Sequence, residues 1–506
     1  MPAPQIITLT ANDGSTVQFV NEVKGSGAMK DVYFSPDKSY VVGFFRDKQD
    51  AIAKARLEDI TGRYRDQVFN QIGGKYWEDF FCWPTKIVEW NGKTGIVCPT
   101  YQSKYFFKGG RFDGQEKQGK WFASAKLMNK FIEPDQKGTF LTHMNMCLKI
   151  ARAVRRMHAA GLAHSDLSYK NVLVDPLSSS ASIIDIDGLV VPGKYPPDVM
   201  GTPDFVAPEV LETRAEPLID PATKQINPRK KLPSRLTDEH ALAVLIYMYL
   251  LNRHPLRGGR VCDLDPAKDE ELSMGKMALF VEHPTDKSNR PKVSQMAPSE
   301  LPQGDVSKRP YTICGPYLKP LFDKAFIDGL HTPALRPTAN EWEDALVRTT
   351  DLMIPCPNKQ NCEAKWFVFD NTSRPRCPFC GAEYHGQLPI LNLYYSHRAG
   401  SFHPENHRLM VYDGQSLYMW HVNRNIAPNE RIKDEHKKPV GDFHFHQGGW
   451  ILINRRLNNM WDVTSPDNHK QVKIGEFVEL TEGKLILFDK DVTIGGRLAL
   501  VQLMSN

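Results

Sequence analysis

The chain contains the sequence His164-Ser-Asp-Leu-Ser-Tyr-Lys-Asn171-Val-Leu-Val-Asp175, shortly after Gly161. Within this stretch, Asp166 precedes the asparagine by five residues. A carboxylate can accept the proton of a hydroxyl group, and an amide oxygen can bind Mg²⁺. The spacing therefore predicts one loop that carries two polar side chains with different chemical tasks.

The segments on either side of this loop have complementary patterns. Apolar residues recur at spacings of three and four between 147 and 157, which predicts an amphipathic helix that ends at Gly161. After the loop, Ser182-Ile-Ile-Asp-Ile-Asp-Gly188 predicts a strand that delivers Asp185 to a turn, as a metal-binding aspartate requires. The sequence Gly201-Thr-Pro-Asp-Phe-Val-Ala-Pro-Glu209 follows.

Residues 1–100 are rich in strand patterns. The turn at 35–39 lies between two apolar runs and predicts a hairpin, and Asn91-Gly92 predicts a second one. Gly25 and Gly27 lie one residue apart, so backbone amides there can approach a phosphate chain. Taken alone, this glycine pair is more often an ordinary turn.

Together these segments resemble the eukaryotic-type protein kinase family, whose glycine-rich loop, catalytic loop, D-F-G segment and A-P-E segment occur in this order. The resemblance implies an α+β, two-lobed protein-kinase-like fold. It places the N-lobe at 1–100 and the C-lobe at 101–350, with a surface insertion near 212–235. The apolar run 241–251 is then a buried helix of the C-lobe.

The resemblance also implies the roles of individual residues. Asp166 is the base that orients the acceptor hydroxyl, while Asn171 and Asp185 hold Mg²⁺ on ATP. Lys170 serves the γ-phosphate, and Asp187 either joins the metal site or tightens the turn. The remaining nucleotide-binding positions are Gly25, Gly27, Lys30, Val32 and Arg46, with Val97 and Pro99 in the hinge that faces adenine.

The phosphate-binding cation departs from the family pattern, because the strand Val41-Val-Gly-Phe-Phe-Arg46 carries no lysine. Lys30 replaces the third glycine of the phosphate loop, as in the with-no-lysine kinases, and we expect it to substitute. Arg46 is the alternative, although strand parity places it on the other face from Phe45. The acid that pairs with this cation is either Glu58 or Asp66.

The loop from Asp187 to Gly201 contains Tyr195 as its single hydroxyl residue. Ser165 stands where the family places the arginine that binds a phosphorylated loop. Both observations predict activity without phosphate on this loop. The resemblance further implies a buried Asp238 at the start of the long helix, and an ion pair between Arg336 and Glu209.

Four cysteines lie close together in the sequence, namely Cys356, Cys362, Cys377 and Cys380. A Cys-x₂-Cys-Gly turn lets backbone amides point at thiolate sulfur, and two such pairs bind Zn²⁺ tetrahedrally. We therefore predict a structural zinc ribbon over 351–386, with a redox disulfide pair as the alternative.

Residues 387–506 alternate short apolar strands with turns, for example at 408–412, 416–420 and 450–454. This predicts a small β-sandwich. The segment 471–480 resembles the late strands of forkhead-associated domains, which bind phosphothreonine. A sandwich that serves for protein contacts alone remains the alternative.

Composition limits the class of protein. The chain has 506 residues, of which 41% are hydrophobic and 24% are charged, as in folded globular proteins. The net charge of +5 is too small to require nucleic acid or an anionic membrane as partner. The longest apolar run has eleven residues, whereas a membrane span needs about 20. We expect a cytoplasmic protein.

A kinase followed by a zinc ribbon resembles the bacterial protein kinases of tellurite-resistance-type stress systems. That resemblance implies a von Willebrand A-type protein and a metal-dependent phosphatase as partners. The sequence thus predicts an ATP- and Mg²⁺-dependent protein kinase, of Ser/Thr specificity, with partner-recruiting C-terminal modules. Its rivals are a pseudokinase scaffold without phosphotransfer, and AMP transfer or small-molecule phosphorylation on the same fold.

Overall fold

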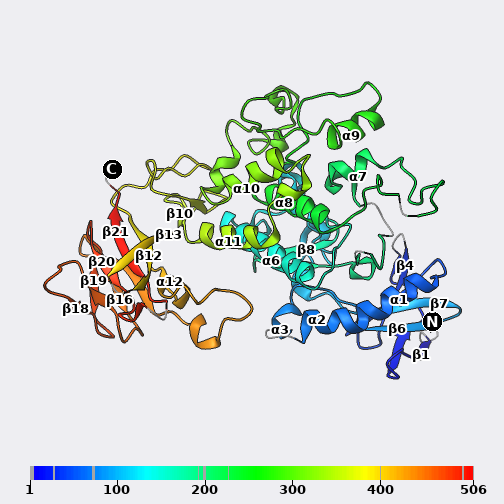
Figure 1. Cartoon of the computed structure of the whole chain (residues 1–506), viewed down its shortest axis with the longest axis horizontal. Coiled ribbons are helices and arrows are strands. Elements are labelled where there is room, and N and C mark those ends of the chain that lie inside the picture. Colours follow the sequence, from blue (N-terminus) through cyan, green and yellow to red (C-terminus); the bar gives the residue numbers. More distant parts are fainter. Residues whose placement is uncertain are drawn as a thin grey trace. The chain divides into compact units, whose positions relative to one another are not determined.

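The computed structural model describes residues 5–26, 29–70, 74–191, 193–197, 201–225, 227–398, 400–492 and 495–504. The chain divides into two compact units (Figure 1). Unit 1 contains residues 1–138, 142–311 and 320–343, and unit 2 contains 139–141, 312–319 and 344–506.

The N-terminal part of unit 1 is an antiparallel sheet. Its strands, in spatial order, are β3 (Gly25–Ser26), β4 (Lys30–Phe34), β5 (Tyr40–Phe45), β7 (Lys93–Pro99) and β6 (Lys86–Trp90). A separate hairpin of β1 (Ile6–Thr10) and β2 (Thr16–Val20) precedes them. Both predicted hairpins are confirmed. Asn91 and Gly92 have φ angles of 50° and 74°, as the two central residues of a tight hairpin turn require.

Strand alternation gives this sheet two different faces. One face is apolar and aromatic, because Val42, Phe44 and Val97 pack there with Phe19 of β2. The other face carries Lys30 opposite Phe45, and Gly43 opposite Ile96. Lys30 therefore projects from the face of the sheet opposite the aromatic cluster.

Helices follow β5 along the chain. These are α1 (Ala51–Asp59), a π-helical turn at Ile60–Tyr64, α2 (Arg65–Phe69) and α3 (Gly74–Trp77). Figure 1 shows α1 running beside β6 and β7, and Leu57 of α1 packs against Phe45 and Ile96. The π-helical turn contains Gly62.

The rest of unit 1 is mainly helical, around α8 (Arg235–Leu251). Residues 237–251 of α8 are all buried, which confirms the predicted core helix. The amphipathic helix is α6 (Phe140–Ala159), and β8 (Val172–Asp175) and β9 (Ser180–Ile183) form a hairpin after it. The other helices of unit 1 are α4 (Lys120–Ala123), α5 (Ala125–Phe131), α7 (Pro208–Glu212) and α9 (Pro266–Met274), together with all but the first residue of α10 (Lys319–Asp323). Helix α11 (Ala339–Thr350) begins in unit 1 and belongs to unit 2 from Asp344 onward. None of the helices in the described part of the chain combines the length and the hydrophobicity of a membrane-spanning segment.

Unit 2 combines the cysteine-rich hairpin with two antiparallel sheets. The hairpin strands are β10 (Met353–Pro355) and β11 (Trp366–Val368). One sheet contains, in spatial order, β13 (Ser401–Met410), β12 (Pro389–Arg398), β21 (Leu498–Leu503), β20 (Leu485–Leu487), β17 (Trp461–Asp462) and β18 (Lys470–Gln471). The other contains β14 (Ser416–Leu417), β15 (Gly441–His446), β16 (Gly449–Asn454) and β19 (Phe477–Glu479).

One sequence-based expectation changes in unit 2. The strand expected at 416–420 ends at Leu417, and α12 (Met419–Val422) begins there. The imidazole Nδ1 of His421 accepts a hydrogen bond from the backbone nitrogen of Tyr418, which favours this helical turn. Buried residues of the cysteine hairpin and of the sheets belong to one apolar core.

Candidate active site

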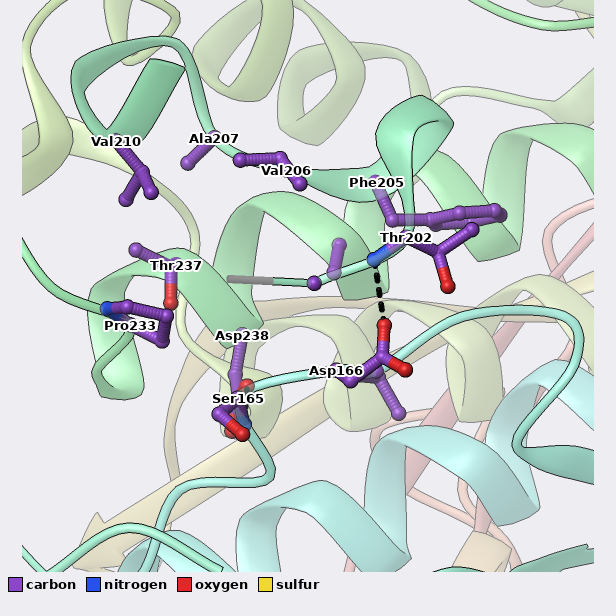
Figure 2. Close-up of a pocket in the computed structure, with 13 residues that line it drawn as sticks. Ser165, Asp166, Thr202, Phe205, Val206, Ala207, Val210, Pro233, Thr237 and Asp238 are labelled. Atoms are coloured by element: carbon purple, nitrogen blue, oxygen red, sulfur yellow. Dashed lines mark hydrogen bonds between the residues drawn. The ribbon is translucent and has the colours of Figure 1, made fainter. Parts of the chain in front are cut away.

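The loop after α6 brings Asp166 and Asn171 into direct contact. The amide nitrogen of Asn171 donates to the backbone oxygen of Asp166 at 2.8 Å and to its carboxylate at 2.9 Å. The other carboxylate oxygen accepts a hydrogen bond from the backbone nitrogen of Thr202 at 2.6 Å. Figure 2 shows the Asp166 carboxylate directed at that nitrogen. The candidate base is therefore fixed from both sides.

Asp238 of α8 binds the start of this loop through its carboxylate. Its carboxylate accepts hydrogen bonds from the backbone nitrogens of His164 at 2.7 Å and Ser165 at 3.3 Å, and Figure 2 shows Asp238 beside Ser165. Asp238 is 1% exposed, as the resemblance implied. Ser165 has a φ of 67°, a left-handed conformation that few non-glycine residues adopt without such external bonds.

Asp185 is delivered to the same place by β9. His164 bonds through Nε2 to the backbone oxygen of Ile184 at 2.9 Å, which ties the residue before Asp185 to the catalytic loop. Asp185 itself has a φ of 61°, so two adjacent loops carry left-handed residues at this point. The resulting site joins Asp166, Asn171 and Asp185 from segments that the sequence separates.

Lys30 reaches this site from the sheet. Its Nζ lies 2.6 Å and 2.7 Å from the two carboxylate oxygens of Asp187, and 3.2 Å from Asp185. The side chain passes over Gly43, where a Cβ would stand 3.6 Å from the Cδ of Lys30. Arg46 instead pairs with Asp31 at 3.0 Å on the exposed side. Of the two predicted cations, Lys30 is the one placed at the acidic site.

The charges of this group stabilise one another. Burial opposes the charge of the Lys30 ammonium, but the carboxylates of Asp187 and Asp185 outweigh this effect and raise the pKa of Lys30. Burial likewise tends to raise the pKa of Asp185, yet the Lys30 charge prevails and the pKa is lowered. Lys30 is thus held protonated beside ionised Asp185.

The acid expected to pair with Lys30 lies elsewhere than the sequence suggested. Glu58 and Asp66 are both exposed, and Asp66 accepts a hydrogen bond from Asn70. Asp187 pairs with Lys30 instead, and it stands where the D-F-G segment has glycine. The sequence contained a signal for this pairing. Lys30 and Asp187, which carry opposite charges, each stand at a position where the family has glycine.

The remaining described residues that were predicted to bind the nucleotide or the γ-phosphate lie farther from the acidic group. Gly25 pairs with Val32 across β3 and β4, whereas Gly27 lies outside the described residues. The Val97 side chain packs on the aromatic face of the sheet, away from Lys30. Pro99 is exposed at the end of β7, and Lys170 is an exposed side chain in the catalytic loop.

The oxygen donors of this site fit a hard divalent cation. The amide nitrogen of Asn171 is engaged with Asp166, which leaves its amide oxygen as a ligand. The Asp185 side chain is 53% exposed and offers a carboxylate. Amide and carboxylate oxygens together are a donor set that Mg²⁺ accepts, with phosphate and water oxygens as its further ligands.

The predicted ion pair between Arg336 and Glu209 is confirmed. The two guanidinium nitrogens bond to the two carboxylate oxygens at 2.8 Å and 2.7 Å, and the Arg336 side chain is 1% exposed. This bidentate pair ties α7 to the segment that contains Arg336.

The four clustered cysteines converge in unit 2. Their sulfur atoms all lie within 4.8 Å of one another, with Cys356 and Cys380 3.5 Å apart and Cys362 and Cys377 3.9 Å apart. A disulfide requires about 2.05 Å. Sulfurs about 2.3 Å from a tetrahedral zinc ion lie about 3.8 Å apart, so this arrangement fits Zn²⁺. It is the single such cluster among the described residues.

Comparison with known proteins agrees with the arrangement in unit 1. Residues 122–311 match the family model described as protein kinase domain. This match covers the catalytic loop, Asp185 and the core helix α8. The chain therefore contains a protein kinase domain.

Individual relatives match shorter segments. Calcium-dependent protein kinase 4 of Arabidopsis thaliana is 43% identical over 75 residues, which is 14% of this chain and 15% of that relative. Death-associated protein kinase dapk-1 of Caenorhabditis elegans is 33% identical over 114 residues, covering 22% and 7% of the two chains. A solved kinase domain of a Toxoplasma gondii rhoptry antigen is 16% identical, with a TM-score of 0.36, and covers 55% and 84%.

Proposed function

We propose that this protein is an ATP- and Mg²⁺-dependent protein kinase that transfers the γ-phosphate to serine or threonine hydroxyls of protein substrates. The convergence of Asp166, Asn171, Asp185 and Lys30 carries the proposal. A chain that kept the fold for binding alone would not need to preserve a base, two cation ligands and a phosphate-binding cation together. The protein kinase domain match over 122–311 supports the same class.

In this proposal each side chain has a defined task. The Asp166 carboxylate, fixed by Thr202 and Asn171, accepts the proton of the attacking hydroxyl. The Lys30 ammonium provides positive charge for the phosphate chain from the position beside Asp185. When bound through Asn171 and Asp185, Mg²⁺ would neutralise phosphate charge.

The proposal includes activity without phosphate on the 187–201 loop. Ser165 offers no cation for such a phosphate, and the backbone of Thr202 is already bonded to Asp166. We also propose that residues 351–386 form a structural zinc ribbon and that a C-terminal β-sandwich recruits partners. The stress-system partners and a cytoplasmic location are part of the same proposal.

Intact-mass spectrometry of the protein and a test substrate, after incubation with Mg-ATP, separates the candidate functions. A mass gain of one phosphoryl group on the substrate, lost in Asp166→Ala, supports the kinase. A gain of AMP indicates adenylyl transfer. Nucleotide binding without any mass change indicates the pseudokinase scaffold and would overturn the proposal.

A further inference from the structure

Three consecutive residues of the 187–201 loop contact α1. The hydroxyl of Tyr195 donates to the Asp59 carboxylate at 2.7 Å and lies 3.1 Å from the backbone oxygen of Ala55. The ammonium of Lys194 pairs with the same Asp59 carboxylate. In the other direction, the Arg56 guanidinium donates to the backbone oxygen of Pro196 at 2.7 Å. We name Lys194, Tyr195 and Pro196 the clamp segment.

Two of the side chains in these contacts are buried, whereas the Lys194 side chain is half exposed. Tyr195 is 4% exposed and Arg56 is 2% exposed. The Arg56 guanidinium lies 5.9 Å and the Lys194 ammonium 4.8 Å from the centre of the Tyr195 ring. Cations near an aromatic face add to the hydrogen bonds that hold the Tyr195 side chain. Such packing favours one position of the clamp segment over others.

The clamp segment is also joined to the catalytic loop. Val191 and Tyr195 exchange backbone hydrogen bonds of 2.9 Å and 3.2 Å. One residue before Val191, Val190 exchanges two more with Ala163, at 2.8 Å and 3.0 Å. Ala163 directly precedes His164 in the sequence. A continuous set of hydrogen bonds therefore runs from the catalytic loop to α1.

Helix α1 in turn forms a wall of the candidate active site. Its residues Ala53, Arg56 and Leu57 line a cavity of about 50 Å³ together with the acids of the site, which are Asp166, Asp185 and Asp187. A displacement of α1 would change the surroundings of the carboxylates that Lys30 contacts. The position of this helix is therefore a condition for the geometry of the site.

We propose that the clamp segment fixes α1 in its working position, with Tyr195 as the positioning residue, and that it replaces a phosphate on the loop. The inference rests on the proposed kinase function, and it concerns how the geometry of that active site is maintained. Phosphate on Tyr195 would place about two negative charges against Asp59 and remove the donated hydrogen bond. Phosphorylation here therefore lowers activity, contrary to the usual effect of a loop phosphate.

Hydrogen exchange of the nucleotide-free full chain tests the clamp. In Tyr195→Phe we expect backbone exchange in residues 51–59 to rise about fivefold, the factor for one lost hydrogen bond of about 1 kcal/mol. The matched control is Tyr40→Phe, which also removes a hydroxyl bonded to backbone, at 2.8 Å from Gln18 and away from α1. Exchange in α8 serves as the internal reference.

A second measurement excludes a general loss of stability. We expect the KM for ATP to rise in Tyr195→Phe but not in Tyr40→Phe, while the melting temperatures of the two variants stay equal. Asp59→Ala should raise exchange in residues 51–59 as well. The double variant should exceed neither single variant by much, because both changes remove the hydrogen bond between Tyr195 and Asp59.

Unchanged exchange in residues 51–59 of Tyr195→Phe, or an equal rise in Tyr40→Phe, would overturn the clamp. This result is distinct from failure of the proposed function, because exchange is measured without turnover. The clamp can be absent in an active kinase, and it can be present in a chain that transfers no phosphate.

Discussion

The ammonium of Lys30 lies 2.6 Å and 2.7 Å from the two carboxylate oxygens of Asp187, although 157 residues separate them in the chain. The Asp187 side chain is only 11% exposed. This pair brings a cation from the sheet to the turn that carries Asp185. It connects the nucleotide-binding strands with the candidate metal ligands.

Replacement of Lys30 should weaken nucleotide binding. We expect Lys30→Met to raise the Kd for ATP at least about tenfold, because a charged contact contributes about 1.5–3 kcal/mol. Arg46→Met is the control, since it removes the same charge from an exposed pair and should change the Kd less than about twofold. Titration calorimetry measures both, and an unchanged Kd in Lys30→Met would show that another group binds the phosphates.

Asp187 should act as the partner of Lys30 rather than as an independent metal ligand. We expect Asp187→Asn to weaken ATP binding, with no recovery at raised Mg²⁺ concentration. The Lys30→Met/Asp187→Asn double variant should bind ATP about as weakly as Lys30→Met, because the two residues act through one contact. Separate roles would be indicated if the losses of ATP affinity in the two single variants added up in the double variant, or if Mg²⁺ restored ATP binding in Asp187→Asn.

The cysteine cluster should hold one zinc ion per chain. We expect Cys377→Ser to lose the metal and to lower the stability of unit 2, because Cys377 belongs to the same buried core as the sheets. Cys262→Ser, which lies outside the cluster, should retain zinc. Elemental analysis combined with thermal unfolding measures this, and a stable chain without zinc would contradict the assignment.

A buried histidine should make unit 1 sensitive to acid. His254 accepts a hydrogen bond from the Leu256 backbone nitrogen through Nδ1, so Nε2 donates to the backbone oxygen of Asp204 at 2.8 Å. This requires the neutral imidazole, and burial lowers the pKa of His254 to about 4. The ordinary value is about 6.5, so between about pH 6.5 and 4 the unfolded chain binds a proton that the folded chain does not.

The unfolding free energy should therefore fall as the pH drops through this range, by up to about 3 kcal/mol from this residue. We expect the difference in unfolding free energy between the wild type and His254→Gln to shrink from pH 7 to pH 4.5. Other titrating groups, such as Glu239 with its pKa raised to about 7, cancel in this difference. A difference that is constant with pH would contradict the assignment.

Local sequence signals predicted much of the fold. The Asn91-Gly92 turn, the amphipathic pattern of α6 and the apolar run of α8 are each determined within a short segment, and the structure confirms all three. The helical turn α12 was not predicted, because the alternation of apolar and polar residues at 416–420 favours a strand. The hydrogen bond between the Tyr418 backbone and the His421 side chain, which favours the helical turn, is not visible in that alternation.

The site was predicted only in part, for a physical reason. Asp166, Asn171 and Asp185 occur in recognisable segments, so their types and spacing indicate their chemistry. The partner of Lys30 and the contact between Tyr195 and Asp59 depend on tertiary packing between distant segments, which no local pattern encodes. The hinge prediction at Val97 likewise needed the strand register, which turns that side chain to the aromatic face.

Transfer of labelled γ-phosphate from Mg-ATP to protein hydroxyls, compared between the wild type and Asp166→Asn, tests the central assignment most directly. We predict transfer by the wild type that falls at least about a hundredfold in the variant, the contribution of a positioned base, while ATP affinity is retained. Wild-type protein that binds ATP but transfers no label, or equal transfer by Asp166→Asn, would contradict it.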